Sequence, residues 1–217
     1  MLAAVIFDVD GTLLDTERQY IQAWKPAGAL LGYPMTDALM YSTRGRDGQT
    51  VQRLMVEALG EDFPYDEARK LRVSLAEEAI SREKNLCKPG AMELLTELSR
   101  LGIPFAAATT TDKDLTAAHL EAAGLARLVT HRVTGDMVEH SKPAPDIYLK
   151  AAALLGVAPG ECLAVEDSLA GLAAATAAGM QTVWIPDLHS NPCPGQAHCS
   201  RRYESLTQLL KDLPQWI

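Results

Sequence analysis

Residues 3–16 of the chain read AAVIFDVDGTLLDT. The apolar run at residues 3–7 stops abruptly at the sequence DVDG, which is typical of a buried parallel strand that leads into a turn. This pattern places the carboxylates of Asp8 and Asp10 at the carboxyl end of the strand. In open α/β sheets the binding site lies at that edge, so we expect functional residues where strands end.

Similar short apolar runs follow along the chain, and most are separated by helical patterns that end in glycine. They lie at residues 103–108, 128–133, 163–165 and 182–185. One helical pattern spans residues 92–101 before Gly102, and Ser168 can cap another helix that runs to Gly179. This alternation predicts an α/β fold with a doubly wound, Rossmann-like parallel sheet.

Residues 16–85 break the alternation. They show helical periodicity at residues 20–31 and 51–59 and no convincing strand. We therefore expect an α/β core domain made of residues 1–15 and 86–217, with a small all-helical domain of residues 16–85 inserted into it.

The composition is that of an ordinary globular protein. Of the 217 residues, 47% are apolar and 22% are charged, and 28 acidic against 20 basic residues give a net charge of −8. Without a Lys/Arg cluster, this charge disfavours nucleic-acid binding. No apolar run approaches the roughly 20 residues that span a bilayer, and the N-terminus lacks the pattern of a secretory signal. We expect a cytoplasmic enzyme without a membrane partner, and a monomer or weak dimer.

Four cysteines are too few for a disulfide framework in a chain of this length, which favours reduced thiols. Cys162 lies in an apolar run, where buried free thiols are common. Cys193 and Cys199 lie near His189 and His198 and could bind zinc, although their spacing matches no usual zinc module. The alternative is a polar, Pro-rich surface loop.

The sequence DVDGTLLDT at residues 8–16 resembles the signature loop of the haloacid dehalogenase superfamily, in its phosphatase version. Three further motifs follow in the expected order: a strand that ends in Thr109, KPAPD at residues 142–146, and VEDS at residues 165–168 with Gly171. Each motif alone would be read as a turn or a helix cap, but their joint order at strand ends favours a catalytic site. The resemblance covers essentially the whole chain.

The resemblance implies that the inserted helices form a cap domain, as in the subgroup that contains β-phosphoglucomutase and phosphoglycolate phosphatase. It also implies that Asp8 is a covalent nucleophile and that Mg²⁺ is the cofactor. Asp8, Asp167 and the backbone carbonyl of Asp10 would supply oxygen ligands to the metal. Glu166 would orient this group of ligands.

The remaining motif residues would bind phosphate and transfer protons. Lys142, the Thr109 hydroxyl and the Thr110 backbone N–H would donate to the phosphoryl oxygens. Asp10 would protonate the leaving alkoxide and later deprotonate the attacking water. Family members that cleave carbon–halogen bonds or phosphonates lack this second aspartate, so Asp10 favours phosphate esters.

The resemblance therefore implies a Mg²⁺-dependent hydrolase that acts on a small phosphorylated metabolite, such as a sugar phosphate, through an aspartyl-phosphate. One alternative is a phosphomutase of the β-phosphoglucomutase type, which is disfavoured because those enzymes carry a histidine where Tyr20 stands here. The other is a non-catalytic phosphate-binding module, which is disfavoured because all the expected catalytic residues are present.

Substrate specificity is expected to come from polar residues of the cap and from one lysine after the threonine cluster. These candidates are Glu17, Tyr20, Trp24, Arg44, Arg46 and Lys113. Tyr20 and Trp24 share a helical face with apolar residues, so packing is an equal alternative for them. The two arginines and Lys113 could equally be solvated.

Overall fold

The computed structural model describes residues 2–43, 48–83, 85–187 and 199–217. The chain divides into two compact units. Met1–Asp15 and Lys84–Ile217 form the first, which we call the sheet unit, and Thr16–Glu83 form the second, which we call the helical unit.

The sheet unit contains a six-stranded sheet of order β3-β2-β1-β4-β5-β6, in which all neighbouring strands are parallel. The strands are β1 (Ala4–Phe7), β2 (Phe105–Ala108), β3 (Arg132–Val133), β4 (Cys162–Glu166), β5 (Gln181–Trp184) and β6 (Arg201–Arg202). Every residue of β1, β2 and β4 is buried, as expected for a parallel sheet covered on both faces. The predicted doubly wound α/β fold is confirmed.

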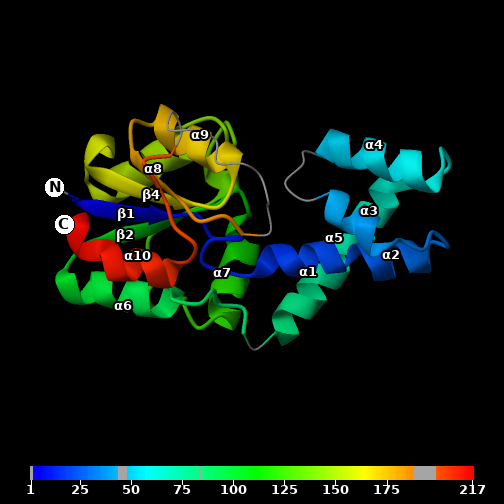
Figure 1. Cartoon of the computed structure of the whole chain (residues 1–217), viewed down its shortest axis with the longest axis horizontal. Helices are drawn as coiled ribbons and strands as arrows, with labels where there is room; N and C mark the ends of the chain where they lie inside the picture. The colour runs from blue at the N-terminus through cyan, green and yellow to red at the C-terminus, as the bar shows by residue number, and fades with distance from the viewer. Residues whose placement is uncertain (1, 44–47, 84, 188–198) are drawn as a thin grey trace. The chain divides into compact units, whose positions relative to one another are not determined.

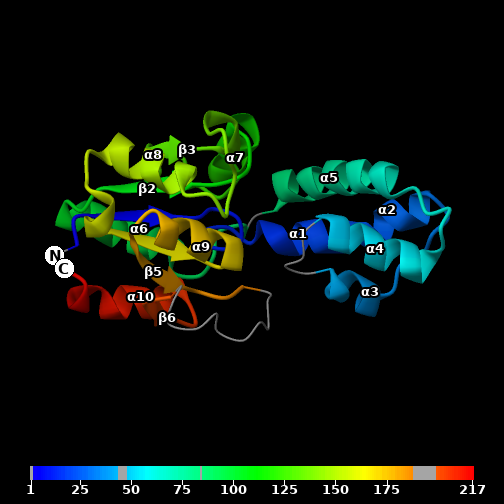
Figure 2. The ribbon, with the colours of Figure 1, turned by 90° about the horizontal axis from the view of Figure 1, so that it is seen from above.

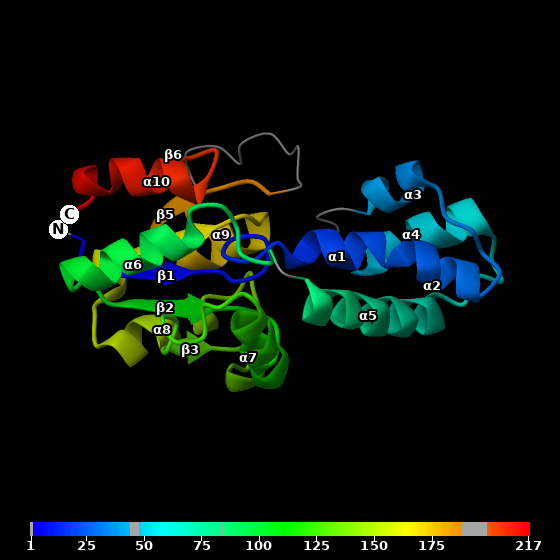
Figure 3. The same ribbon diagram turned by 90° about the horizontal axis from the view of Figure 1, so that it is seen from below.

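Helices cover both faces of the sheet (Figure 1). They are α6 (Ala91–Leu101), α7 (Lys113–Ala122), α8 (Asp146–Leu155), α9 (Leu169–Ala177) and α10 (Leu206–Asp212), with single 3₁₀ turns at Gly135–Met137, Pro159–Glu161 and Leu213–Gln215. α8 and α9 pack on one face, and α6 and α10 lie against each other on the opposite face, which Figure 3 views directly. Alanine-rich strands allow the helices of the first face to approach closely, and the buried core there includes Ile6, Ala106, Val133, Tyr148 and Ala164.

Two predicted helix ends are confirmed by their caps. Gly102 ends α6 in a left-handed conformation with a φ of 70°, which favours glycine. The Ser168 side chain accepts a hydrogen bond from the backbone N–H of Gly171 over 3.0 Å and so caps α9.

The helical unit consists of α1 (Thr16–Gln22), α2 (Trp24–Leu30), α3 (Asp37–Ser42), α4 (Gly48–Leu59) and α5 (Tyr65–Arg82), and no strand occurs among its described residues (Figure 2). The helical pattern at residues 20–31 corresponds to two helices, α1 and α2, separated at Ala23. Pro26 has no N–H to donate to the carbonyl four residues earlier, which explains the break. None of the described helices is both long enough and apolar enough to cross a membrane.

Candidate active site

The sequence motifs meet at the carboxyl edge of the sheet. Asp8 follows β1, Thr109 follows β2 and Asp167 follows β4. Phe7, the last residue of β1, pairs with residues near the ends of both β2 and β4, so these three positions lie at one level. The strand order reverses between β1 and β4, and ligands of α/β sheets bind at such a switch point.

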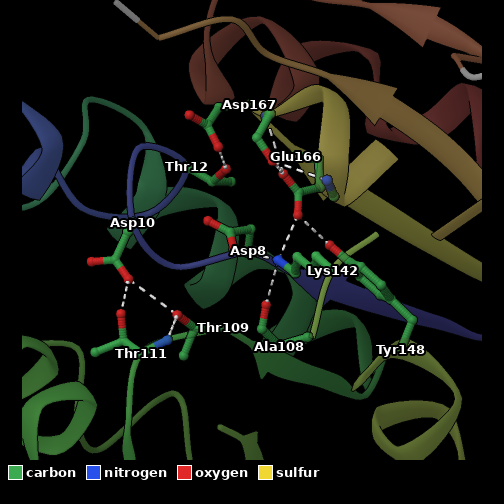
Figure 4. Close-up of polar contacts among 12 residues, drawn as sticks. Asp8, Asp10, Thr12, Ala108, Thr109, Thr111, Lys142, Tyr148, Glu166 and Asp167 are labelled. Atoms are coloured by element: carbon green, nitrogen blue, oxygen red, sulfur yellow. Dashed lines mark hydrogen bonds and ion pairs between the residues drawn. The ribbon is translucent and has the colours of Figure 1, made fainter. Parts of the chain in front are cut away.

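Lys142 lies between the carboxylates of Asp8 and Glu166 and contacts both (Figure 4). Its Nζ donates to Asp8 Oδ1 over 2.5 Å, to Glu166 Oε1 over 2.6 Å and to the carbonyl of Ala108 over 3.0 Å. The lysine side chain is 5% exposed. Burial alone would lower the pKa of Lys142, but the nearby charges of Asp8 and Glu166 outweigh burial and raise it, which favours the ammonium form of the lysine.

Glu166 is fully buried and accepts hydrogen bonds at both oxygens. Oε1 accepts from Lys142 and, over 2.6 Å, from the hydroxyl of Tyr148, while Oε2 accepts from the backbone N–H and the hydroxyl of Ser168 over 3.1 and 2.9 Å. A Cβ atom at Gly171 would lie 1.7 Å from Glu166 Oε1, so the carboxylate occupies space that only glycine leaves. Four donor groups on three residues thus hold the Glu166 carboxylate in place.

Three carboxyl groups of the site are close enough together to hold a metal ion. Oxygens of Asp8, Glu166 and Asp167 all lie within 4.8 Å of one another. Burial raises the pKa of Asp8 well above its usual range, although Lys142 acts in the opposite direction. When all are ionised, these three carboxyl groups and the ammonium group of Lys142 together carry two more negative than positive charges. A divalent cation with a preference for oxygen ligands, such as Mg²⁺, fits this set of donors.

Asp167 is held against the turn that follows β1. Gly11 has a φ of 87°, and a Cβ atom there would lie 2.4 Å from Asp167 Oδ2, so the turn requires glycine on both counts. The hydroxyl of Thr12 donates to Asp167 Oδ1 over 3.5 Å. The sequence DGT therefore shapes the space in which Asp167 lies.

Asp10 lies apart from the lysine and contacts hydroxyl groups instead (Figure 4). Its Oδ2 accepts from Thr109 Oγ1 over 3.0 Å and from Thr111 Oγ1 over 2.7 Å. Its Oδ1 lies 3.8 Å from Nδ1 of the buried His119 of α7. The side chain of Asp10 is 25% exposed, in contrast to that of Asp8 at 10%.

Three residues at this site were absent from the sequence prediction: Thr111, His119 and Tyr148. Thr111 could have been found, because it follows the strand end two residues after Thr109. His119 and Tyr148 lie on helices α7 and α8, where their spacing resembles that of ordinary buried positions. Nothing in the sequence indicated that their polar atoms face the motif residues.

The other candidates in the sheet unit lie at the surface. Thr110 is exposed, and its carbonyl packs so closely on Gly135 that a Cβ atom there would lie 2.2 Å away. Lys113 is exposed and starts α7, with its backbone N–H donating to Asp136 Oδ1 over 3.0 Å.

The candidates in the helical unit differ in their surroundings. Trp24 is buried, with its ring 5.9 Å from that of Tyr65 and 4.9 Å from the guanidinium of Arg72, so it packs inside the unit. The Tyr20 hydroxyl donates to Glu77, and Glu17 is half-buried.

Some predicted residues lie outside the described part of the chain: Arg44, Arg46, His189, Cys193 and His198. Of the four possible zinc ligands, the structure describes Cys199, which is buried beside Leu172 and Trp184. Its thiol donates to the carbonyl of Arg201 over 3.1 Å.

The fold and the site together define an α/β enzyme with a carboxylate–lysine centre at the switch point of its sheet. The chain belongs to the haloacid dehalogenase-like hydrolase family, whose family model matches residues 2–179.

Individual relatives agree with this family. A protein of Drosophila melanogaster named probable pseudouridine-5'-phosphatase is 38% identical over 196 residues, which cover 84% of this chain and 80% of that protein. Hexitol phosphatase A of Escherichia coli (strain K12) is 34% identical over 181 residues, 83% of this chain and 81% of the relative. A solved structure from Thermotoga maritima, provisionally assigned as a β-phosphoglucomutase, covers all of both chains with a TM-score of 0.83 and 27% identity. The chain is therefore an enzyme of the haloacid dehalogenase-like phosphatase type.

Proposed function

We propose that this enzyme hydrolyses the phosphate monoester of a small phosphorylated alcohol, such as a sugar phosphate, through an aspartyl-phosphate on Asp8. The observation that carries the proposal is the 2.5 Å contact between Lys142 Nζ and Asp8 Oδ1 at the switch point of the sheet. A carboxylate that attacks a phosphate must approach another anion, and a fixed, buried cation reduces that repulsion.

In the first step, an oxygen of Asp8 forms a bond to phosphorus while the bond from phosphorus to the ester oxygen breaks. Asp10 gives its proton to the ester oxygen, which leaves as a neutral alcohol. Lys142 and the Thr109 hydroxyl stabilise the negative charge on the phosphoryl oxygens. Asp8 then carries the phosphoryl group, and Asp10 is ionised.

In the second step, water attacks phosphorus and the bond from phosphorus to the Asp8 oxygen breaks. Asp10, now a carboxylate, takes a proton from the attacking water. Inorganic phosphate leaves, Asp8 is regenerated as a carboxylate and Asp10 is protonated again. One side chain thus serves as the acid and then as the base.

Asp8, Asp167 and the backbone carbonyl of Asp10 would hold Mg²⁺, which supplies positive charge against the phosphate. Glu166 is proposed to orient Lys142, because both its oxygens already accept hydrogen bonds from the protein. Its contribution is to fix the distance between Lys142 and Asp8.

The substrate class is supported by the names of the relatives. Pseudouridine 5'-phosphate and hexitol phosphates are both phosphate esters of polyhydroxylated carbon skeletons. We propose Glu17, Tyr20, Arg44, Arg46 and Lys113 as residues that select among such substrates. Trp24 is proposed to shape the helical unit rather than to contact substrate, because its side chain is 1% exposed.

A second candidate function is phosphoryl transfer within a sugar phosphate, because the Thermotoga maritima structure provisionally assigned as a β-phosphoglucomutase is 27% identical over the whole of both chains. In that case a sugar phosphate, rather than water, would accept the phosphoryl group from Asp8. Conversion of β-glucose 1-phosphate in the presence of a sugar bisphosphate primer, without net release of phosphate, would favour this function.

The test is release of inorganic phosphate in the presence of Mg²⁺ from a panel of sugar phosphates, hexitol phosphates, nucleotides and phosphoglycolate. Asp8→Asn is expected to lower the rate by about 10³-fold or more, because the nucleophile is removed. Asp66→Asn, at an exposed position in the first turn of α5, is the control and should leave the rate unchanged. Equal rates for Asp8→Asn and wild type would rule out the proposed mechanism.

A further inference from the structure

Two threonine hydroxyls converge on one oxygen of Asp10 (Figure 4). Thr109 Oγ1 and Thr111 Oγ1 both donate to Asp10 Oδ2, over 3.0 and 2.7 Å. The backbone N–H of Thr111 also donates to Thr109 Oγ1 over 3.1 Å. The three residues therefore form one small hydrogen-bonded network beyond the end of β2.

A hydroxyl group has a single proton to donate, and this limits what Thr109 can do. In the structure that proton is directed at Asp10. The proposed hydrolysis requires Thr109 to donate to a phosphoryl oxygen, so Thr109 must release Asp10 when a phosphate ester binds. Thr111 supplies the shorter of the two bonds and is the hydroxyl that can remain on Asp10.

We propose that Thr111 is a positioning residue that keeps the Asp10 carboxyl group directed at the leaving oxygen while Thr109 binds phosphate. The inference rests on the proposed function, because it assigns Thr111 a role through the acid–base action of Asp10. His119 limits movement on the other side, with Nδ1 lying 3.8 Å from Asp10 Oδ1. Asp10 is thus bounded by a hydroxyl at one oxygen and by a buried ring at the other.

The hydroxyl of Thr111 can be removed without removing its backbone contacts. The Thr111 carbonyl accepts from the backbone N–H of Gly135 over 3.0 Å, and the Thr111 N–H donates to Thr109. The side chain is half-buried, so valine, which keeps the β-branch of threonine and replaces its hydroxyl by a methyl group, should fit. The effect of Thr111→Val should therefore report the hydrogen bond to Asp10.

The experiment compares two substrates that differ in their need for an acid. A sugar phosphate must release an alkoxide, which requires a proton, whereas p-nitrophenyl phosphate releases a phenolate that departs without one. Thr111→Val is expected to lower kcat/KM for the sugar phosphate by about 10- to 100-fold, since general acid catalysis contributes about 10²- to 10⁴-fold in full. For p-nitrophenyl phosphate we expect kcat/KM to change by less than about 3-fold, because its leaving group needs no proton from Asp10.

Three variants complete the design. Thr111→Ser retains the hydroxyl and should restore most of the lost kcat/KM, while Thr111→Ala should behave like the valine variant. Thr96→Val removes a 2.7 Å hydrogen bond from an exposed threonine to the carbonyl of Met92 and should leave both substrates unaffected.

Equal losses with both substrates, no loss with either, or failure of both the valine and alanine variants to fold would overturn the role of Thr111. The proposed function itself would fail if the wild type showed no turnover, or a turnover that Asp8→Asn, measured in parallel, leaves unchanged. That result would overturn the inference as well, but it is recognised without any Thr111 variant.

Discussion

Replacing Tyr148 by Phe removes one hydroxyl from the most buried part of the site and leaves the ring in place. The hydroxyl donates to Glu166 Oε1 over 2.6 Å, and the ring centroid lies 5.1 Å from Lys142 Nζ. Burial raises the pKa of Tyr148 well above its usual value, and the charges of Glu166 and Asp8 add to this effect. The hydroxyl is therefore a neutral donor at any working pH, and its loss leaves Glu166 Oε1 with Lys142 as its described donor.

A hydrogen bond to a charged group contributes about 1.5–3 kcal/mol, so the free energy of unfolding should fall by about that amount. The measurement is chemical denaturation of wild type and variant, in which a lower midpoint with an unchanged slope indicates lost stability. The matched control is Tyr33→Phe, whose exposed hydroxyl donates to the carbonyl of Asp62 and should change the stability by less than about 0.5 kcal/mol. Equal stability of the two variants would refute the importance of the Tyr148–Glu166 bond.

The remaining predictions concern the glycine beside Glu166 and the metal. Gly171→Ala places a Cβ atom 1.7 Å from Glu166 Oε1 and should lower both kcat and the melting temperature. Gly48→Ala should leave both near wild type, because a Cβ atom there would meet none of the described non-adjacent residues within 4 Å. Similar behaviour of the two variants would contradict the close packing of Glu166. Removing divalent cations with EDTA should abolish phosphate release, and Mg²⁺ should restore it. Asp167→Asn should raise the Mg²⁺ concentration for half-maximal activity by about 10-fold or more, and an unchanged Mg²⁺ dependence would argue against Asp167 as a ligand.

The sheet was predictable because its central strands are buried on both faces and therefore consist of apolar runs. β1, β2 and β4 all lie within or beside the runs found in the sequence. β6 was missed because it consists of two exposed arginines at the edge of the sheet. β6 pairs with β5 through the backbone, which does not require apolar side chains. The sequence therefore shows no apolar pattern at this strand.

The site was predictable only where backbone position determines side-chain position. Asp8, Thr109 and Asp167 follow strands directly, so the parallel sheet brings them to one edge regardless of the rest of the fold. Tyr148 reaches Glu166 only because α8 packs across the sheet, and its sequence position resembles that of its buried neighbours on the same helix. Contacts of this kind depend on tertiary packing, which a single sequence does not reveal.

The two aspartates of the first motif have different partners, and the difference agrees with their proposed roles. Asp8 lies against the ammonium group of Lys142, which opposes the effect of burial on the pKa of Asp8 and so favours the carboxylate form that attacks. Asp10 must alternate between an acid and a carboxylate, so a fixed cation would favour one of its two states. Its Oδ2 accepts from the hydroxyls of Thr109 and Thr111, which donate to a carboxylate and can accept from a protonated acid, and the ring of His119 lies 3.8 Å from its Oδ1. Replacing Thr111 by a lysine is therefore expected to hold Asp10 as a carboxylate and to lower turnover of alkyl phosphate esters more than Thr111→Val does, although the lysine retains a donor.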